Sequence, residues 1–164
     1  MDLASFWEFV DSVRSISEDD DGFIAHLRDA LLERDLETLL GFQENLWHVV
    51  DDAYRADLWD AAALINGGCS DDAFEYFRAW LVAQGSSVYR SALDDPDSIA
   101  RIGRPEGELE ELLYLAPTLY EARTGAVMPG LLRAGRVQLK GRREGPETLA
   151  GRFPRLWEKF GTAR

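Results

Sequence analysis

The sequence predicts an all-α protein, a single-domain helical bundle of about seven helices with an irregular C-terminal segment. Apolar residues recur at helical spacing in successive windows of the first 122 residues. Residues that start or stop helices stand between those windows. The 164 residues are enough for one domain with its own core and few for two. We therefore expect one domain, 1–164, made of an acidic helical body (1–122) and a basic C-terminal segment (123–164).

The first third of the chain predicts three helices. Residues 3–13 carry apolar side chains at helical spacing, and Asp2 can cap them. A polar loop, 15–22, precedes a helix that reaches about residue 34, and a third helix spans about 35–54. The acidic run Glu18–Asp21 lacks the spacing of a calcium loop, since position 12 counted from Asp19 is Ala30. We interpret the run as a solvated helix start.

The stretch 61–80 contains a helix end, a helix start and the helix that we expect at the centre of the fold. A short helix over 57–65 ends at Asn66-Gly67-Gly68, residues that tolerate a left-handed cap. Ser70 is the expected cap of the next helix, which runs to about Gln84. That helix has two apolar stripes, formed by Phe74, Phe77 and Leu81 and by Ala73, Tyr76 and Trp80. Because the stripes cover more than half its circumference, we expect this helix in the middle of the bundle.

The remaining elements are shorter. A helix capped by Ser86 or Ser87 is expected to end before Pro96, and a loop with room for one helical turn fills 94–107. Residues 108–116 predict a helix, and Pro117 is expected to open a separate short helix over 117–120. Residues 137–139 suggest a brief strand or extended piece. The amphipathic stretch 146–160 predicts two short helical pieces separated at Pro154.

Charge is unevenly distributed along the chain. Residues 1–122 hold 8 Arg and 27 Asp or Glu, a net charge of −19. Residues 123–164 hold 10 Lys or Arg and 3 Glu, a net charge of +7. This asymmetry favours a basic segment that lies across an acidic body. Binding of nucleic acid by the basic segment is the less favoured alternative, because a body at −19 repels phosphate.

Composition restricts the cellular setting. No apolar run approaches the roughly 20 residues that span a bilayer, so no membrane partner is expected. The first ten residues lack the basic region and cleavage site of a secretion signal. A single cysteine fits a reducing cytoplasm.

The candidate site surrounds the turn at 66–70. Cys69 lies at a helix start, which lowers a thiol pKa, but Asp71 and Asp72 oppose that effect, so a small residue in a tight turn is favoured over a nucleophile. Around it, one set of side chains could line a polar pocket (Asn66, Asp71, Asp72 and Arg78), and another could form its walls (Trp59, Tyr76 and Trp80). Such a pocket would accept a cationic or hydroxylated ligand more readily than phosphate. Helix caps and a local Arg–carboxylate pair are the favoured structural alternative.

Established catalytic patterns do not occur in the sequence. It has no metal-ligand spacing, no Ser-His-Asp candidate and no phosphate-binding glycine loop. We therefore expect no metal and no cofactor, name no catalytic residue, and lean away from an enzyme.

The run LINGGCSDDAFEYFRAWL at 64–81 resembles the signature of a bacterial family, domain of unknown function 4240. Four further stretches agree with it: Phe6-Trp7, Tyr54–Trp59, Glu111–Tyr114 and Arg152–Trp157. The resemblance implies an all-helical domain, sometimes found beside regulators with DNA-associated modules. It implies no established activity.

Three functions follow as hypotheses. The first is a non-enzymatic protein-interaction or regulatory domain, because no catalytic set accompanies a highly specified core. The second is a small-molecule-binding domain or an uncharacterised enzyme with a pocket near Asn66–Trp80. The third is nucleic-acid binding through the segment Arg133–Arg155.

Overall fold

Helices provide the regular structure of the computed structural model, which describes residues 1–102, 107–130 and 137–161. Within those ranges there is no β-strand, so the prediction of an all-α domain is confirmed. Of the two alternatives for 137–139, a brief strand is wrong, and the extended piece stays a prediction. In place of a strand, Lys140 makes one isolated bridge with Arg55. The helices and helical turns are α1 (Leu3–Ser15), α2 (Asp20–Leu32), α3 (Leu36–Asp52), α4 (Ala56–Asn66), α5 (Asp71–Ala83), α6 (Ser86–Asp94), η1 (Pro96–Arg101), α7 (Glu110–Thr124), η2 (Pro146–Thr148), α8 (Leu149–Arg152), α9 (Pro154–Leu156) and η3 (Trp157–Gly161).

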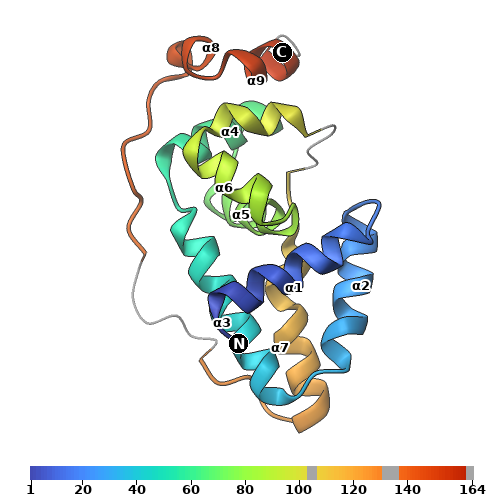
Figure 1. The fold of residues 1–164 in the computed structure, drawn as a ribbon. Helices are drawn as coiled ribbons and strands as arrows, with labels where there is room; N and C mark the ends of the chain where they lie inside the picture. The colour runs from blue at the N-terminus through green and yellow to red at the C-terminus, as the bar shows by residue number, and fades with distance from the viewer. Residues whose placement is uncertain (103–106, 131–136, 162–164) are drawn as a thin grey trace.

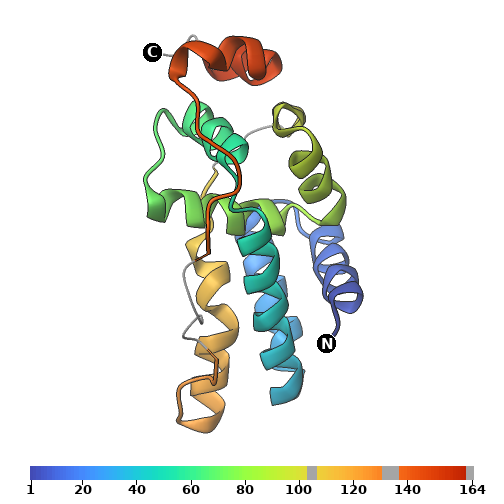
Figure 2. The ribbon, with the colours of Figure 1, turned by 90° about the vertical axis from the view of Figure 1, so that its left-hand side faces the viewer.

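The helices form layers. The long helices α2, α3 and α7 lie side by side, and α1 packs across α2, α3 and α6 (Figure 1). Helix α5 crosses the ends of α3 and α7, and α4 and α6 lie beyond it (Figure 2). Residues 137–145 run along the side of the body towards α4, where α8 and α9 form the last layer (Figure 2). The N-terminus lies at the side of the body, away from the layer of α8 and α9 (Figures 1 and 2).

Helix α5 occupies the centre of the core. Eight of its 13 residues are buried, and it contacts α3, α4, α6 and α7. Phe74 stacks on Trp59 of α4 with ring centroids 4.9 Å apart, and Phe77 lies 5.4 Å from Trp80. Burial of such aromatic surfaces is the largest stabilising contribution that a core of this kind has.

The helix ends follow the capping residues that the sequence indicates. The Asp2 carboxylate accepts the Ser5 N–H at 2.8 Å, and the Ser70 hydroxyl accepts the Ala73 N–H at 3.2 Å. Gly67 closes α4 in the left-handed region, with φ of 71°. These local bonds fix where α1, α4 and α5 begin or end.

The start of α6 differs from the prediction. Neither Ser86 nor Ser87 is its cap, because Gly85 stands at the cap position and α6 already includes both serines. Instead, the Asp11 carboxylate of α1 accepts the Ser86 N–H at 2.7 Å and the Ser86 hydroxyl at 2.6 Å. A residue 75 positions away therefore supplies the cap, which a local pattern does not reveal.

Helix α7 also differs from the prediction, since it continues through Pro117 without a break. Proline has no N–H, so the carbonyl one turn earlier, that of Leu113, loses its usual donor. The buried side chain of Gln43 on α3 donates from Nε2 to that carbonyl at 3.3 Å. A tertiary hydrogen bond therefore replaces the missing helical one and allows a single helix in place of two.

Candidate functional site

The turn between α4 and α5 is fixed from both sides. The Trp59 Nε1–H donates to the backbone carbonyl of Cys69 at 3.0 Å, while its ring stacks on Phe74. The guanidinium of Arg143, from the C-terminal part of the chain, lies 4.7 Å from the centroid of the Trp59 ring. Trp59 is therefore part of the support of the turn.

Cys69 is half-buried, and its surroundings favour the protonated thiol over the reactive thiolate. Burial raises the pKa of Cys69 to about 11, and the negative charge of Glu108 adds to that shift. The positive charges of Arg143 and Arg78 lower the pKa, but the two raising effects are larger. At neutral pH the group is a protonated thiol, which is a poor nucleophile.

The polar residues of the turn face different surroundings. Asp71 and Asp72 are exposed in the first turn of α5, as their capping chemistry indicates. The Asn66 side chain lies against Gly107, where an added Cβ would come within 2.7 Å of Asn66 Oδ1. Asn66 Nδ2 is buried and has no hydrogen-bond acceptor among the described residues.

Tyr76 and Arg78 connect α5 to its neighbours. The Tyr76 hydroxyl donates to Glu110 at 3.0 Å, and this hydrogen bond, with some burial, raises the pKa of Tyr76 to about 12. Arg78 is only 5% exposed and donates to the Val50 carbonyl at 2.8 Å. Its guanidinium lies 4.7 Å from the centroid of the Tyr54 ring, inside the core. Both residues hold helices together.

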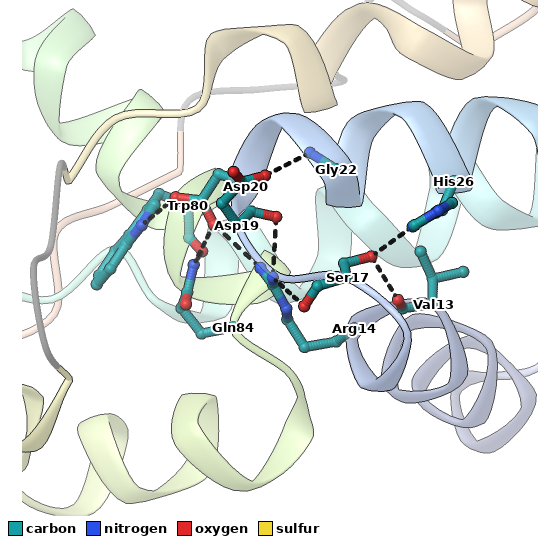
Figure 3. A network of polar contacts seen from close by, with 9 residues as sticks. All are labelled: Val13, Arg14, Ser17, Asp19, Asp20, Gly22, His26, Trp80 and Gln84. Carbon is teal, nitrogen blue, oxygen red and sulfur yellow. Dashed lines mark hydrogen bonds and ion pairs between the residues drawn. The ribbon is translucent and has the colours of Figure 1, made fainter.

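Trp80 belongs to another part of the molecule, the junction of α5 with the loop between α1 and α2 (Figure 3). Its Nε1–H donates to Asp20 Oδ2 at 3.0 Å, while Arg14 and Gln84 donate to Asp20 Oδ1 at 3.0 and 3.1 Å. Asp20 therefore ties the start of α2 to the end of α5, which the sequence-based view of a solvated helix start did not include.

An open cavity of about 370 Å³ adjoins this network. It is lined by Arg14, Glu18, Asp19, Asp20, Asp21, Trp80, Gln84 and Ile102. Four carboxylates against one guanidinium give the cavity a strongly negative potential.

The eight candidate residues thus lie in three surroundings: the turn, the core and the α1–α2 loop. A smaller cavity of about 180 Å³ beside Gly67 and Gly68 is lined by Asp60, Ala63, Gly67, Gly68, Arg143, Glu144, Pro146 and Leu149. A single ligand pocket made by the eight residues stays a prediction.

The C-terminal segment, defined here as residues 137–161, meets the body at two buried carboxylates. The first is Asp60 on α4, which is 2% exposed. Asp60 accepts Arg143 Nε at 2.8 Å, Arg152 Nη1 at 2.8 Å and the Glu144 N–H at 3.2 Å. All three donors come from the C-terminal segment. These are charge-assisted bonds of the strong kind.

The second carboxylate, Asp97 on η1, repeats the arrangement. It is 3% exposed and accepts Arg155 Nε at 2.8 Å, the Arg155 N–H at 3.1 Å and the Leu156 N–H at 2.8 Å. Burial alone would raise the pKa of Asp97, but the hydrogen bonds from Arg155 and Leu156 outweigh it and lower the pKa below its ordinary value. The exposed Asp95 pairs with the other side of the Arg155 guanidinium.

Apolar side chains fill the contact between these two points. Leu149, Phe153 and Leu156 of the segment are buried in the core. Lys159 Nζ donates to the carbonyls of Ala100 and Ile102 at 3.0 and 2.6 Å. We call the surface of α4 and η1 that carries Asp60 and Asp97 the arginine-binding face.

Sequence reasoning named neither Asp60 nor Asp97. One signal was available, since Asp60 stands among Leu58, Ala61, Ala62 and Leu64, which are apolar and buried in α4. A carboxylate amid such residues requires a cationic partner. No comparable signal marks Asp97, because it follows Asp94, Asp95 and Pro96 and precedes Ser98, so no apolar run surrounds it in the sequence.

Across 1–102, 107–130 and 137–161, no group of three or more His, Cys, Asp or Glu side chains is placed to hold a metal ion. The helices in those ranges include none that is long and apolar enough to cross a membrane.

Fold and site together define an all-α domain with an acidic body and a basic segment held at buried carboxylates. The chain belongs to the family described as protein of unknown function (DUF4240), whose match covers residues 1–122. The stretch Arg152–Trp157, in which the sequence analysis also found a resemblance to the family, lies beyond the matched residues. Searches of curated proteins and of solved structures each returned no match.

Proposed function

We propose that this chain is a non-enzymatic protein-interaction domain whose arginine-binding face recognises basic polypeptide segments. The observation that carries the proposal is the pair of buried carboxylates, Asp60 and Asp97, each of which accepts three donors from one basic segment.

Electrostatics support this reading of the face. Removing a carboxylate from water costs several kcal/mol unless cationic or N–H donors replace the lost hydration. Among residues 1–102, 107–130 and 137–161, such donors to Asp60 and Asp97 come only from the C-terminal segment. A face with two such carboxylates discriminates strongly for guanidinium groups, because an uncharged segment would leave both anions unpaired.

The segment resembles a bound peptide in its division of roles. Arg152 and Arg155 supply charge and orientation, while Phe153 and Leu156 supply buried apolar contacts. Arginine paired with buried apolar anchors is the usual composition of an interface centre. The match to the family covers the body, residues 1–122.

Peptide binding in trans tests the proposal. In a full-length variant with Arg143→Gln, Arg152→Gln and Arg155→Gln, here called the released variant, the face loses the arginines of its own segment. A synthetic peptide of residues 137–161 is expected to bind this variant in calorimetry. A peptide with Arg152→Gln and Arg155→Gln, and a released variant that also carries Asp60→Asn and Asp97→Asn, serve as matched controls and should not bind. If the released variant is folded and shows no binding of the unmodified peptide in calorimetry, the proposal is refuted.

A second candidate, binding of a small cation, is favoured by the 370 Å³ cavity next to Trp80. The cavity has a suitable volume for a small ligand. Its four carboxylates favour an amine or guanidinium over an anion. A thermal-shift series of polyamines and guanidinium compounds tests this function, with Glu18→Gln as the variant expected to weaken any hit. If no compound raises the unfolding temperature, the candidate fails.

Nucleic-acid binding has less support. Arg143, Arg152 and Arg155 are engaged by Asp60 and Asp97, so a phosphate backbone would have to displace carboxylates to reach them. Arg133 lies outside the described residues. A gel shift at low salt remains the direct test.

A further inference from the structure

We infer that the C-terminal segment is a built-in competitor that occupies the arginine-binding face and excludes partner segments until it is displaced. This inference rests on the proposed function, because it concerns the regulation of the same face.

Occupancy of the face by the segment is extensive. Arg143 and Arg152 share the Asp60 carboxylate, and Arg155 fills the site at Asp97. Leu156 is fully buried and Phe153 is nearly so. A partner segment that used Asp60 or Asp97 would need the positions that these side chains hold, so partner and segment cannot bind together.

The contacts of the segment are also of a kind that competition can exchange. Arg143 and Arg155 are about two-fifths exposed although the carboxylates they bind are buried. Incoming guanidinium groups can therefore approach the same carboxylates as the resident ones leave, without an interval in which a buried anion stays unpaired. Asp60 makes such an exchange stepwise, because it holds two arginines at once.

The size of the effect follows from tethering. A segment joined to its binding face by a short linker has an effective concentration of about 1 mM. If the segment itself has a Kd of about 10 µM for an empty face, the tethered competitor weakens the apparent binding of a free peptide by about 100-fold. Partners would then bind the unmodified chain only weakly unless their own segment is tighter or more abundant.

The experiment compares one peptide on two full-length chains. The synthetic 137–161 peptide is titrated into the wild-type chain and into the released variant, and apparent Kd values are measured. We expect binding to the wild-type chain to be weaker by about 100-fold. Arg142→Gln is the matched control, since Arg142 is exposed and outside the contacts with Asp60 and Asp97. This variant should bind the peptide as weakly as the wild-type chain does.

Each outcome separates the two proposals. Equal affinity of the two chains would overturn the competitor role and leave the binding face intact. Absence of binding to a folded released variant would overturn both. If the released variant does not fold, hydrogen exchange on the wild-type chain tests displacement of the segment. The Leu156 amide of the chain donates to Asp97, so a large excess of peptide should increase its exchange rate. Unchanged protection of that amide under excess peptide would contradict displacement.

Discussion

At the scale of single residues, Cys69 shows why position alone does not make a thiol reactive. It lies next to a helix start, yet burial and Glu108 raise its pKa to about 11. At pH 7.5 such a group is ionised in roughly one molecule in 3,000, against about one in ten for a free thiol.

We therefore predict slow alkylation of Cys69. Its rate with iodoacetamide at pH 7.5 should be about 300-fold below that of free cysteine, in proportion to the ionised fraction, and should rise steadily to pH 10. Glu108→Gln should speed the reaction because it removes a charge that raises the pKa, whereas Glu111→Gln should not. Rapid alkylation at neutral pH, together with loss of partner binding in Cys69→Ser, would instead favour a functional thiol.

Asp20 is the second residue whose role depends on tertiary contacts. Because it accepts from Arg14, Trp80 and Gln84, Asp20→Ala should reduce the free energy of unfolding by about 1–3 kcal/mol. Asp21→Ala, an exposed neighbour in the same helix turn, should change it by less than about 0.5 kcal/mol. Urea unfolding of both variants checks the difference, and equal effects would show that Asp20 is only a surface charge.

At the scale of elements, the continuity of α7 depends on α3. Gln43 donates to the Leu113 carbonyl because Pro117 cannot. We predict that Gln43→Met destabilises the wild-type chain but does so less when Pro117→Ala restores the backbone N–H, with a coupling free energy of about 1 kcal/mol. A double-mutant cycle by urea unfolding measures it. Additive effects would mean that the Gln43 hydrogen bond does not replace the helical one.

The contact between η1 and α9 should depend on pH through Asp97. Its pKa is lowered in the folded chain, so its contribution to stability is complete above the unfolded value of about 3.9 and is lost as pH falls through the lower folded value. We expect the stability difference between wild type and Asp97→Asn to be constant from pH 5 to 8 and to shrink below pH 4. The exposed Asp94→Asn serves as control. Urea unfolding between pH 2 and 8 tests this, and a difference that grows in acid would contradict it.

At the scale of the whole molecule, charge balance links the body to the segment. A body at −19 repels itself, and the +7 of residues 123–164 offsets part of that repulsion. Removing three arginines changes the net charge from −12 to −15. The released variant should therefore gain more in melting temperature than the wild-type chain as NaCl rises from 0.05 to 0.5 M, because salt screens repulsion between exposed charges. Parallel salt dependence in scanning calorimetry would show that the segment does not balance the body.

The sequence by itself determined the features that depend on neighbours along the chain. The all-α class, the caps at Asp2 and Ser70 and the left-handed end at Gly67 could all be predicted, because helix periodicity and capping act within a few residues. Membership of the family could also be predicted, because its signature is a continuous run of residues that can be read without the fold.

Only the tertiary structure decided what depends on distant partners. Asp11 caps a helix 75 positions away, Gln43 completes a helix interrupted by proline, and Asp60 and Asp97 select arginines from the far end of the chain. The sequence contained the charge asymmetry but not the residues that use it. A buried carboxylate is recognised by what surrounds it in space, and those surroundings exist only once helices distant in sequence have packed together.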